Sequence, residues 1–227
     1  MFSRKELKET AKLQLRGRWG NAILATFLIG LIIGVVSGVV SSIQSLGIFT
    51  PQLGIFTPGF GIFTVLLTAP LQIGLIIFFL AFVRNPQKQD IDKAFSGFNI
   101  YGKSLGIVLW TYLWTFLWTL LFIIPGIVKA LAYSQSYYII ADNPNIKVTD
   151  ALKISMKMTN GYKWDIFIMG LSFIGWALLA VLLCSIGFLW LTPYMKASYA
   201  NMYLKLKELS LESGACTPED FGTAAYN

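Results

Sequence analysis

The sequence predicts an all-α membrane protein, a polytopic helical bundle of about six transmembrane helices. Of its 227 residues, 56% are hydrophobic and only 13% are charged, whereas soluble proteins carry about 25% charged residues. Several apolar runs approach about 20 residues, the length of a helix that crosses a bilayer. Most of the 18 Lys and Arg residues lie near the chain ends or in two internal loops.

The positions of the basic residues also predict the orientation. Loops rich in Lys and Arg stay in the cytoplasm, so we expect both termini to be cytoplasmic. The same rule, together with attraction to anionic lipids, accounts for the formal net charge of +7. Nucleic acid is therefore not an expected partner, and membrane lipids are.

Residues 1–18 form the first predicted unit, a cytoplasmic basic amphipathic helix. Ser3 and Glu6 have the spacing of a capping box, which satisfies free amides at a helix start. One face carries basic residues at helical spacing, namely Lys5, Lys8, Lys12 and Arg16. Such a helix is expected to lie on the inner leaflet, with a solvated tail helix as the alternative.

Residues 19–207 form the predicted transmembrane bundle. Its first two spans cover about 19–42 and 63–83. A Gly-Ile-Phe-Thr-Pro repeat at 47–67 separates them; its glycines and prolines break helices, so we place it outside and assign it no role. A basic cytoplasmic loop follows at 84–103.

The third predicted span, 104–124, carries three tryptophans at helical spacing: Trp110, Trp114 and Trp118. Such a stripe packs against lipid or neighbouring helices, or it forms a binding platform; both interpretations are open. Pro125-Gly126 predicts an outer turn, and the fourth span continues to Ala141.

A second cytoplasmic amphipathic helix is predicted near 149–160, inside the bundle region. Asp150 lies in its first turn, which suits the helix dipole. The fifth and sixth spans cover about 164–184 and 188–206, joined by an uncharged external turn. Residues 208–227 form a polar tail that we expect to be disordered.

Two isolated lysines in the predicted spans are candidates for a ligand site. Lys196 lies about 13 Å from either end of its span, where a charge costs a few kcal/mol on insertion scales. Lys129 lies near the outer turn and can snorkel to the surface. No carboxylate is expected in the membrane core, so we expect a water-lined cavity that accepts an anion. Alternatively, burial leaves Lys196 neutral, or a kink at Pro193 admits water.

The segments around the two lysines are similar, PGIVKALAYSQSYY and PYMKASYANMY, each with Pro, then Lys-Ala, then Tyr. Paired elements of this kind often frame a site near the membrane midplane. The expected anion-facing groups are the two lysines, and the supporting hydrogen-bond donors come from the same segments. The candidate ligand-binding residues are Lys129, Lys196, Tyr133, Tyr199, Gln135 and Asn201.

The residues that most enzymes need are scarce in this chain. It contains no histidine, the commonest general base and metal ligand. Its two cysteines lack metal-site spacing, and no phosphate-binding glycine loop is present. We therefore expect neither metal nor cofactor, and no enzymatic activity.

Residues 122–176 and 189–207, together with the opening Ser3-Arg4-Lys5-Glu6-Leu7-Lys8, resemble a bacterial family of integral membrane proteins, domain of unknown function 975. More weakly, Pro125-Gly126, Ala151-Leu152 and Gly161 are similar to the membrane region of some glycerophosphodiester phosphodiesterases. The resemblance implies a helical bundle in the bacterial cell membrane. It brings no activity and no catalytic residues.

Two functions from different classes are expected. The first is a non-enzymatic membrane protein that binds or helps to translocate an anionic amphiphile or lipid. The second is an accessory protein that docks a membrane-protein partner, or senses lipid charge, through its basic amphipathic helices. The sequence leaves the oligomeric state open.

Overall fold

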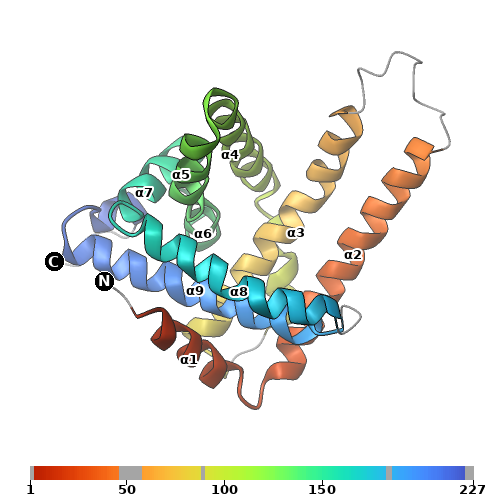
Figure 1. Cartoon of the computed structure of the whole chain (residues 1–227), viewed down its shortest axis with the longest axis horizontal. Helices are drawn as coiled ribbons and strands as arrows, with labels where there is room; N and C mark the ends of the chain where they lie inside the picture. The colour runs from red at the N-terminus through yellow and green to blue at the C-terminus, as the bar shows by residue number, and fades with distance from the viewer. Residues whose placement is uncertain (1–2, 46–57, 88–89, 183–185, 223–227) are drawn as a thin grey trace.

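A computed structural model describes the chain over residues 3–45, 58–87, 90–182 and 186–222. In these ranges all regular structure is helical (Figure 1), which confirms the predicted all-α class. Four described helices are long and apolar enough to cross a membrane: α2 (Trp19–Ser45), α3 (Pro58–Arg84), α4 (Tyr101–Leu121) and α8 (Lys163–Leu182). They support the assignment as a membrane protein.

The six predicted spans are not all confirmed. The fourth is divided into two short helices, α5 (Ile123–Tyr133) and α6 (Ser136–Asp142). The sixth lies in α9 (Phe188–Glu212), which continues into a charged segment with Lys205 and Lys207. Neither has the combination of length and apolar character of the other four.

The predicted cytoplasmic loop at 84–103 folds back against α3, the most buried of the four apolar helices. A 3₁₀ helix, η1 (Ile91–Phe98), packs on α3 at a pair of glycines. A Cβ on Gly97 would overlap the Pro70 carbonyl, and one on Gly74 would overlap the Ala94 carbonyl. Glycine is required here because the two backbones touch.

Pro70 lies inside α3 and has no N–H to donate to the carbonyl of Leu66. The hydroxyl of Tyr101, at the start of α4, donates to that carbonyl at 3.1 Å. The third copy of the repeat belongs to α3, which begins at Pro58 rather than at 63. The part of the repeat at 47–57 lies outside the described residues.

The chain reverses at Phe122 rather than at Pro125-Gly126. Phe122 is extended, and Pro125 lies in the first turn of α5, where a missing N–H has no cost. A Cβ on Gly126 would overlap Thr119. Gly126 therefore allows α5 to pack closely on α4, and it does not form the turn itself.

The N-terminal helix α1 (Arg4–Leu15) begins as predicted, with the Ser3 hydroxyl accepting from the Glu6 amide at 3.3 Å. Its apolar residues Leu7, Ala11 and Leu15 are buried in the protein core, and α1 packs on α9. That face is covered by protein and is not available to insert into the inner leaflet.

Helix α7 (Val148–Met158) lies where the second amphipathic helix was predicted, near 149–160. Its apolar residues Leu152, Ile154 and Met158 are buried, and α7 packs on α6. Gly161 follows with φ of +84°, a conformation that favours glycine after a helix end.

The segment 208–222 is ordered, although we expected a disordered tail. Helix α9 continues to Glu212, and a second 3₁₀ helix, η2 (Pro218–Phe221), follows with a capping box at Thr217. Phe221 is buried, and its carbonyl accepts from the Asn143 side chain at 2.9 Å.

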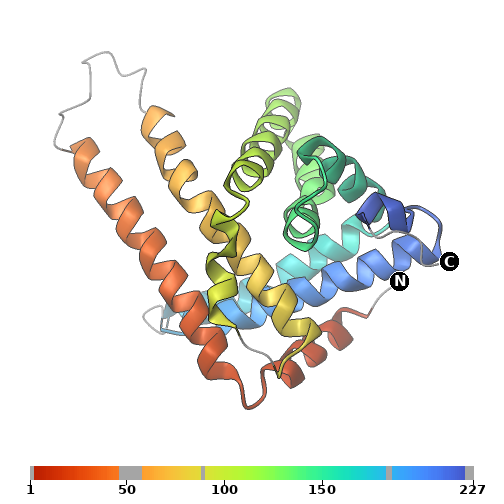
Figure 2. The same ribbon diagram turned by 180° about the vertical axis from the view of Figure 1, so that it is seen from behind.

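Figures 1 and 2 show how these helices are arranged. Helices α2 and α3 lie next to each other, and α4 and α5 form a second pair. Helices α8 and α9 lie side by side and run across α3, with α1 beside α9. The axes of α8 and α9 therefore point in a different direction from those of α2 and α3.

Candidate functional site

A cavity of about 360 Å³ lies between α4, α5 and α7. We call it the tryptophan cavity. It is lined by aromatic and basic side chains, chiefly Trp110, Trp114, Trp118, Lys129, Tyr133 and Lys153. Two of the six predicted site residues, Lys129 and Tyr133, therefore share one cavity with the predicted tryptophan stripe.

The helix pattern explains how these groups meet. The three tryptophans recur every fourth residue and so occupy one face of α4. The rings of Trp110 and Trp114 pack edge to face, with centroids 6.3 Å apart. The close approach of α5 at Gly126 brings Lys129 alongside this face.

The Lys129 ammonium is surrounded by soft, electron-rich groups. Its Nζ lies 4.7 Å from the Trp118 ring centroid, 6.0 Å from that of Tyr133 and 4.0 Å from the Met156 sulfur. Aromatic faces attract cations but leave the positive charge in place. No carboxylate of the described residues forms an ion pair with Lys129.

The second cation of the cavity, Lys153, has a partner. Its Nζ lies 3.4 Å from the Asp150 carboxylate, and both side chains are exposed. Exposed pairs of this kind contribute little to stability, and an incoming anion can compete for the lysine. The cavity therefore offers an uncompensated charge at Lys129 and a weakly paired one at Lys153.

The structure places Lys196 apart from Lys129. Lys196 is half-buried on α9 and does not line the tryptophan cavity. Among the described residues, no hydrogen bond or ion pair reaches its amine. The two similar segments also differ in form, since the first is broken at Ser134-Gln135 and the second is continuous helix.

The remaining candidates contact other parts of the core. The Tyr199 ring lies 5.9 Å from that of Phe173. Gln135 is buried and donates to the Ser134 hydroxyl at 3.0 Å, while its carbonyl oxygen has no partner in the described structure. None of these side chains lines the tryptophan cavity.

The Asn201 side chain forms hydrogen bonds that connect helices. Its amide donates to the Gln14 carbonyl oxygen at 2.7 Å and accepts from the Gln14 amide at 3.3 Å. The Gln14 amide also donates to the Val83 carbonyl at 3.0 Å. This network joins α1, α3 and α9, so Asn201 is a structural residue in this state.

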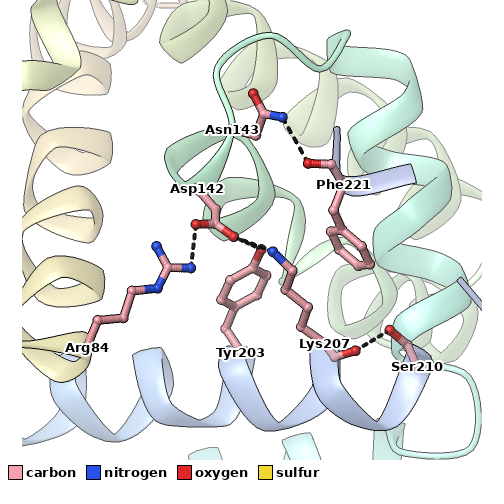
Figure 3. Close-up of polar contacts among 7 residues, drawn as sticks. All are labelled: Arg84, Asp142, Asn143, Tyr203, Lys207, Ser210 and Phe221. Carbon is pink, nitrogen blue, oxygen red and sulfur yellow. Dashed lines mark hydrogen bonds and ion pairs between the residues drawn. The ribbon is translucent and has the colours of Figure 1, made fainter. Parts of the chain in front are cut away.

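A buried charge cluster, which the sequence did not predict, joins α3, α6 and α9 (Figure 3). The Asp142 carboxylate lies 2.5 Å from the Arg84 guanidinium and 2.7 Å from the Lys207 amine. The Tyr203 hydroxyl donates to the same carboxylate at 2.9 Å. The Lys207 amine also lies 4.6 Å from the Phe221 ring centroid, which ties the C-terminal segment to the cluster.

The partners of Asp142 keep it ionised. Burial alone would raise the pKa of this carboxyl, but the Lys207 hydrogen bond and the Arg84 charge outweigh it and lower the pKa. Two cations share one carboxylate, so the cluster is net positive. It holds the ends of α3 and α6 against α9 and is not an empty binding site.

The chain belongs to a family whose function is unknown. The family model described as "Protein of unknown function (DUF975)" matches residues 1–132 and 123–210, which together cover most of the chain. No curated protein and no solved structure matches the chain. Membership confirms the resemblance seen in the sequence and supplies no ligand, activity or partner.

Proposed function

We propose that this protein binds, and helps to move, an anionic amphiphile or lipid in the bacterial cell membrane, without catalysing a reaction. The observation that carries the proposal is the tryptophan cavity, where the Lys129 ammonium lies on aromatic rings without an ion-pair partner among the described residues. An anionic group of the ligand would neutralise the Lys129 ammonium, and its apolar chain would pack against the tryptophan face of α4.

The size and setting of the cavity favour an amphiphile over a free ion. Ligand cavities commonly measure about 300–1,000 Å³ and combine apolar walls with few polar groups. This one, at about 360 Å³, suits a small headgroup with the first part of a chain. The exposed apolar surface of α4, including Leu117 and Leu121, continues the chain path toward lipid.

We further propose that both termini are cytoplasmic. Two arrangements meet this condition: six spans, or a hairpin of α8 and α9 that stays on the cytoplasmic side. The second is favoured because Gly187, at the closed end of that hairpin, lines one cavity with Lys12 and Arg16 of the N-terminal segment. Six spans would place Gly187 at the opposite surface.

The direct test measures binding by the purified full chain in a neutral detergent. Lysophosphatidylglycerol and lysophosphatidylcholine serve as anionic and zwitterionic probes, and isothermal titration calorimetry gives both affinities. Lys129→Met removes the charge and keeps much of the side-chain volume. We expect it to weaken binding of the anionic probe about tenfold, equivalent to about 1.4 kcal/mol, and to leave the zwitterionic probe unchanged.

Lys93→Met is the matched control, because Lys93 is an exposed lysine of η1, outside the cavity, that pairs with Asp90. Equal affinities of wild type and Lys129→Met for the anionic probe, with equal thermal stability, would rule the proposal out.

An accessory role is the second candidate. Lys153 and Lys157 project from α7 as exposed side chains, and Lys157 lies 3.4 Å from Asp220 of the C-terminal segment. A docking role predicts that another membrane protein co-purifies with wild type and is lost from Lys153→Gln/Lys157→Gln. Retention of that partner would contradict this role.

A further inference from the structure

A second and larger cavity lies where the segment joining α1 to α2 meets the closed end of the α8–α9 hairpin. Its volume is about 640 Å³, and we call it the elbow cavity. Its lining combines two cations with four aromatic side chains: Lys12, Arg16, Trp19, Trp176, Trp190 and Tyr194. No residue of the tryptophan cavity contributes to it.

Four basic residues follow one another at a spacing of four along α1 and its C-cap: Arg4, Lys8, Lys12 and Arg16. We call this row the basic stripe of α1; Lys5, which the sequence grouped with these residues, pairs instead with Glu9 at 4.0 Å. The stripe is divided between protein partners and the elbow cavity. At the first position, Arg4 lies 3.6 Å from the Asp165 carboxylate. At the second, the Lys8 amine donates to the Ser172 hydroxyl at 2.6 Å and lies 4.2 Å from the Phe173 ring centroid. The protein therefore supplies partners for the first two cations of the stripe.

The last two cations of the stripe lack an anionic partner. Lys12 lies 5.6 Å from the Tyr194 ring centroid, and neither Lys12 nor Arg16 forms an ion pair with any described carboxylate. They are four residues apart, so they are neighbours on one side of the chain. The burial of Leu15 fixes α1 in the position that presents both cations to the cavity.

The aromatic residues of the elbow cavity come from three helices, α2, α8 and α9. Trp176 is 58% exposed and Trp190 is 52% exposed. In a soluble protein, tryptophan side chains are usually more buried than this. Tryptophan gathers at the boundary between the bilayer and water, and basic residues gather at its cytoplasmic side. Both features place this cavity at the level of lipid headgroups.

The apolar side of the elbow cavity opens toward lipid. Leu179 and Leu182 line it and remain exposed on the outer face of α8. A ligand with its anion at Lys12 and Arg16 can therefore extend an apolar chain along α8 into the bilayer. A free inorganic anion would leave this apolar surface uncovered.

We propose that the elbow cavity binds one anionic phospholipid. Its phosphate lies between Lys12 and Arg16, and the first part of its acyl chains lies against Trp176 and Trp190. This site is independent of the proposed function, because it shares no residue with the tryptophan cavity. The bound lipid would hold the end of α1 against the α8–α9 hairpin.

The test uses the full chain in neutral detergent. Phosphatidylglycerol and phosphatidylcholine with brominated acyl chains are titrated, and quenching of tryptophan fluorescence reports binding near Trp19, Trp176 and Trp190. Lys129→Met is the background for every variant, so that the Lys129 charge of the tryptophan cavity does not contribute to the difference between the two lipids. Lys12→Gln/Arg16→Gln removes both charges, and we expect at least about tenfold weaker binding of phosphatidylglycerol, with phosphatidylcholine unchanged.

Two control variants separate charge from folding. Lys5→Gln/Lys205→Gln also removes two positive charges, but from exposed ion pairs with Glu9 and Glu208. This variant should bind phosphatidylglycerol as tightly as the background does. Lys12→Arg/Arg16→Lys keeps both charges and should also retain binding. Unchanged phosphatidylglycerol binding by Lys12→Gln/Arg16→Gln would overturn the proposal. Equal loss in the charge-keeping variant, or displacement of the lipid by inorganic phosphate, would also overturn it.

Discussion

At the scale of single residues, Asp142 joins three helices through one carboxylate. Its carboxylate is buried and contacts Arg84, Lys207 and Tyr203 from two other helices. Removing one member of a buried ion pair leaves its partner uncompensated, which costs more than the pair itself contributes. The two cations would then repel each other inside the protein.

Asp142→Asn should therefore lower the free energy of unfolding by about 2 kcal/mol. This is below the usual 3–5 kcal/mol for a broken buried pair, because water reaches the half-exposed Arg84 side chain. Thermal or denaturant unfolding in detergent measures the change. Glu208→Gln, which breaks an exposed pair with Lys205, should change stability by less than about 1 kcal/mol. Similar losses in both variants would contradict the role of the cluster.

The lowered pKa of Asp142 also predicts a pH dependence. A carboxyl with a lower pKa in the folded state stabilises the protein above its ordinary pKa of about 3.9. That contribution is lost as the pH falls through the folded-state value. The stability difference between wild type and Asp142→Asn should be constant from pH 7 to about 5 and should shrink below about pH 4. A difference that grows on acidification would contradict this assignment.

The sequence predicted Lys129 and Tyr133 as candidate site residues, because an isolated lysine in an apolar helix is costly without a function, and both line the tryptophan cavity. It missed the Asp142 cluster, because Arg84 and Lys207 are distant in the chain and each was explained as a cytoplasmic charge. The contact of Asn201, a predicted ligand-binding residue, with Gln14 was missed for a related reason. Its hydrogen-bond partner, Gln14, lies in a helix that was expected to contact lipid instead of α9.

At the scale of helices and loops, η1 packs on α3 through direct backbone contact. Composition and charge predicted a cytoplasmic loop at 84–103, but a pattern of charges does not show that a loop returns to pack on a helix. The only sequence signal was the pair of glycines that make the backbone contact, Gly74 and Gly97. Amphipathic periodicity likewise located α1 and α7 but not the protein surfaces that cover their apolar faces.

Gly97→Ala should destabilise the protein by about 1–3 kcal/mol, the usual cost of overpacking a core, because its Cβ would overlap the Pro70 carbonyl. Gly102→Ala is the matched control, since nothing lies within 4 Å of its Cβ position in α4. Alanine is also the better helix former, so this variant should be neutral or slightly stabilising. Unfolding in detergent compares the two. Equal stability of both variants would show that η1 does not rest on α3.

At the scale of the whole molecule, hydropathy predicted the helical class and the four most apolar helices. It could not decide the path of α9, which is apolar at its start and charged at its end. It also could not show that α8 and α9 run across α3 (Figure 1). That arrangement depends on contacts between distant segments, such as Arg4 with Asp165.

The position of the α8–α9 hairpin predicts the accessibility of Ile186, which is exposed beside Gly187. In a background with both native cysteines replaced by serine, Ile186→Cys should react with an impermeant maleimide only after the cells are opened. Ile123→Cys, at the exposed reversal between α4 and α5, should react in intact cells. Labelling of Ile186→Cys from outside would instead support six spans.

The most direct measurement of the central claim is photo-crosslinking of the full chain with phosphatidylglycerol that carries a diazirine near its headgroup. Mass spectrometry of the digested protein then locates the labelled residues. We predict labelling of the α4 face that carries Trp110, Trp114 and Trp118, with loss of that labelling in Lys129→Met and its retention in Lys93→Met. Equal α4 labelling in Lys129→Met, or equal labelling by the phosphatidylcholine analogue, would contradict the account.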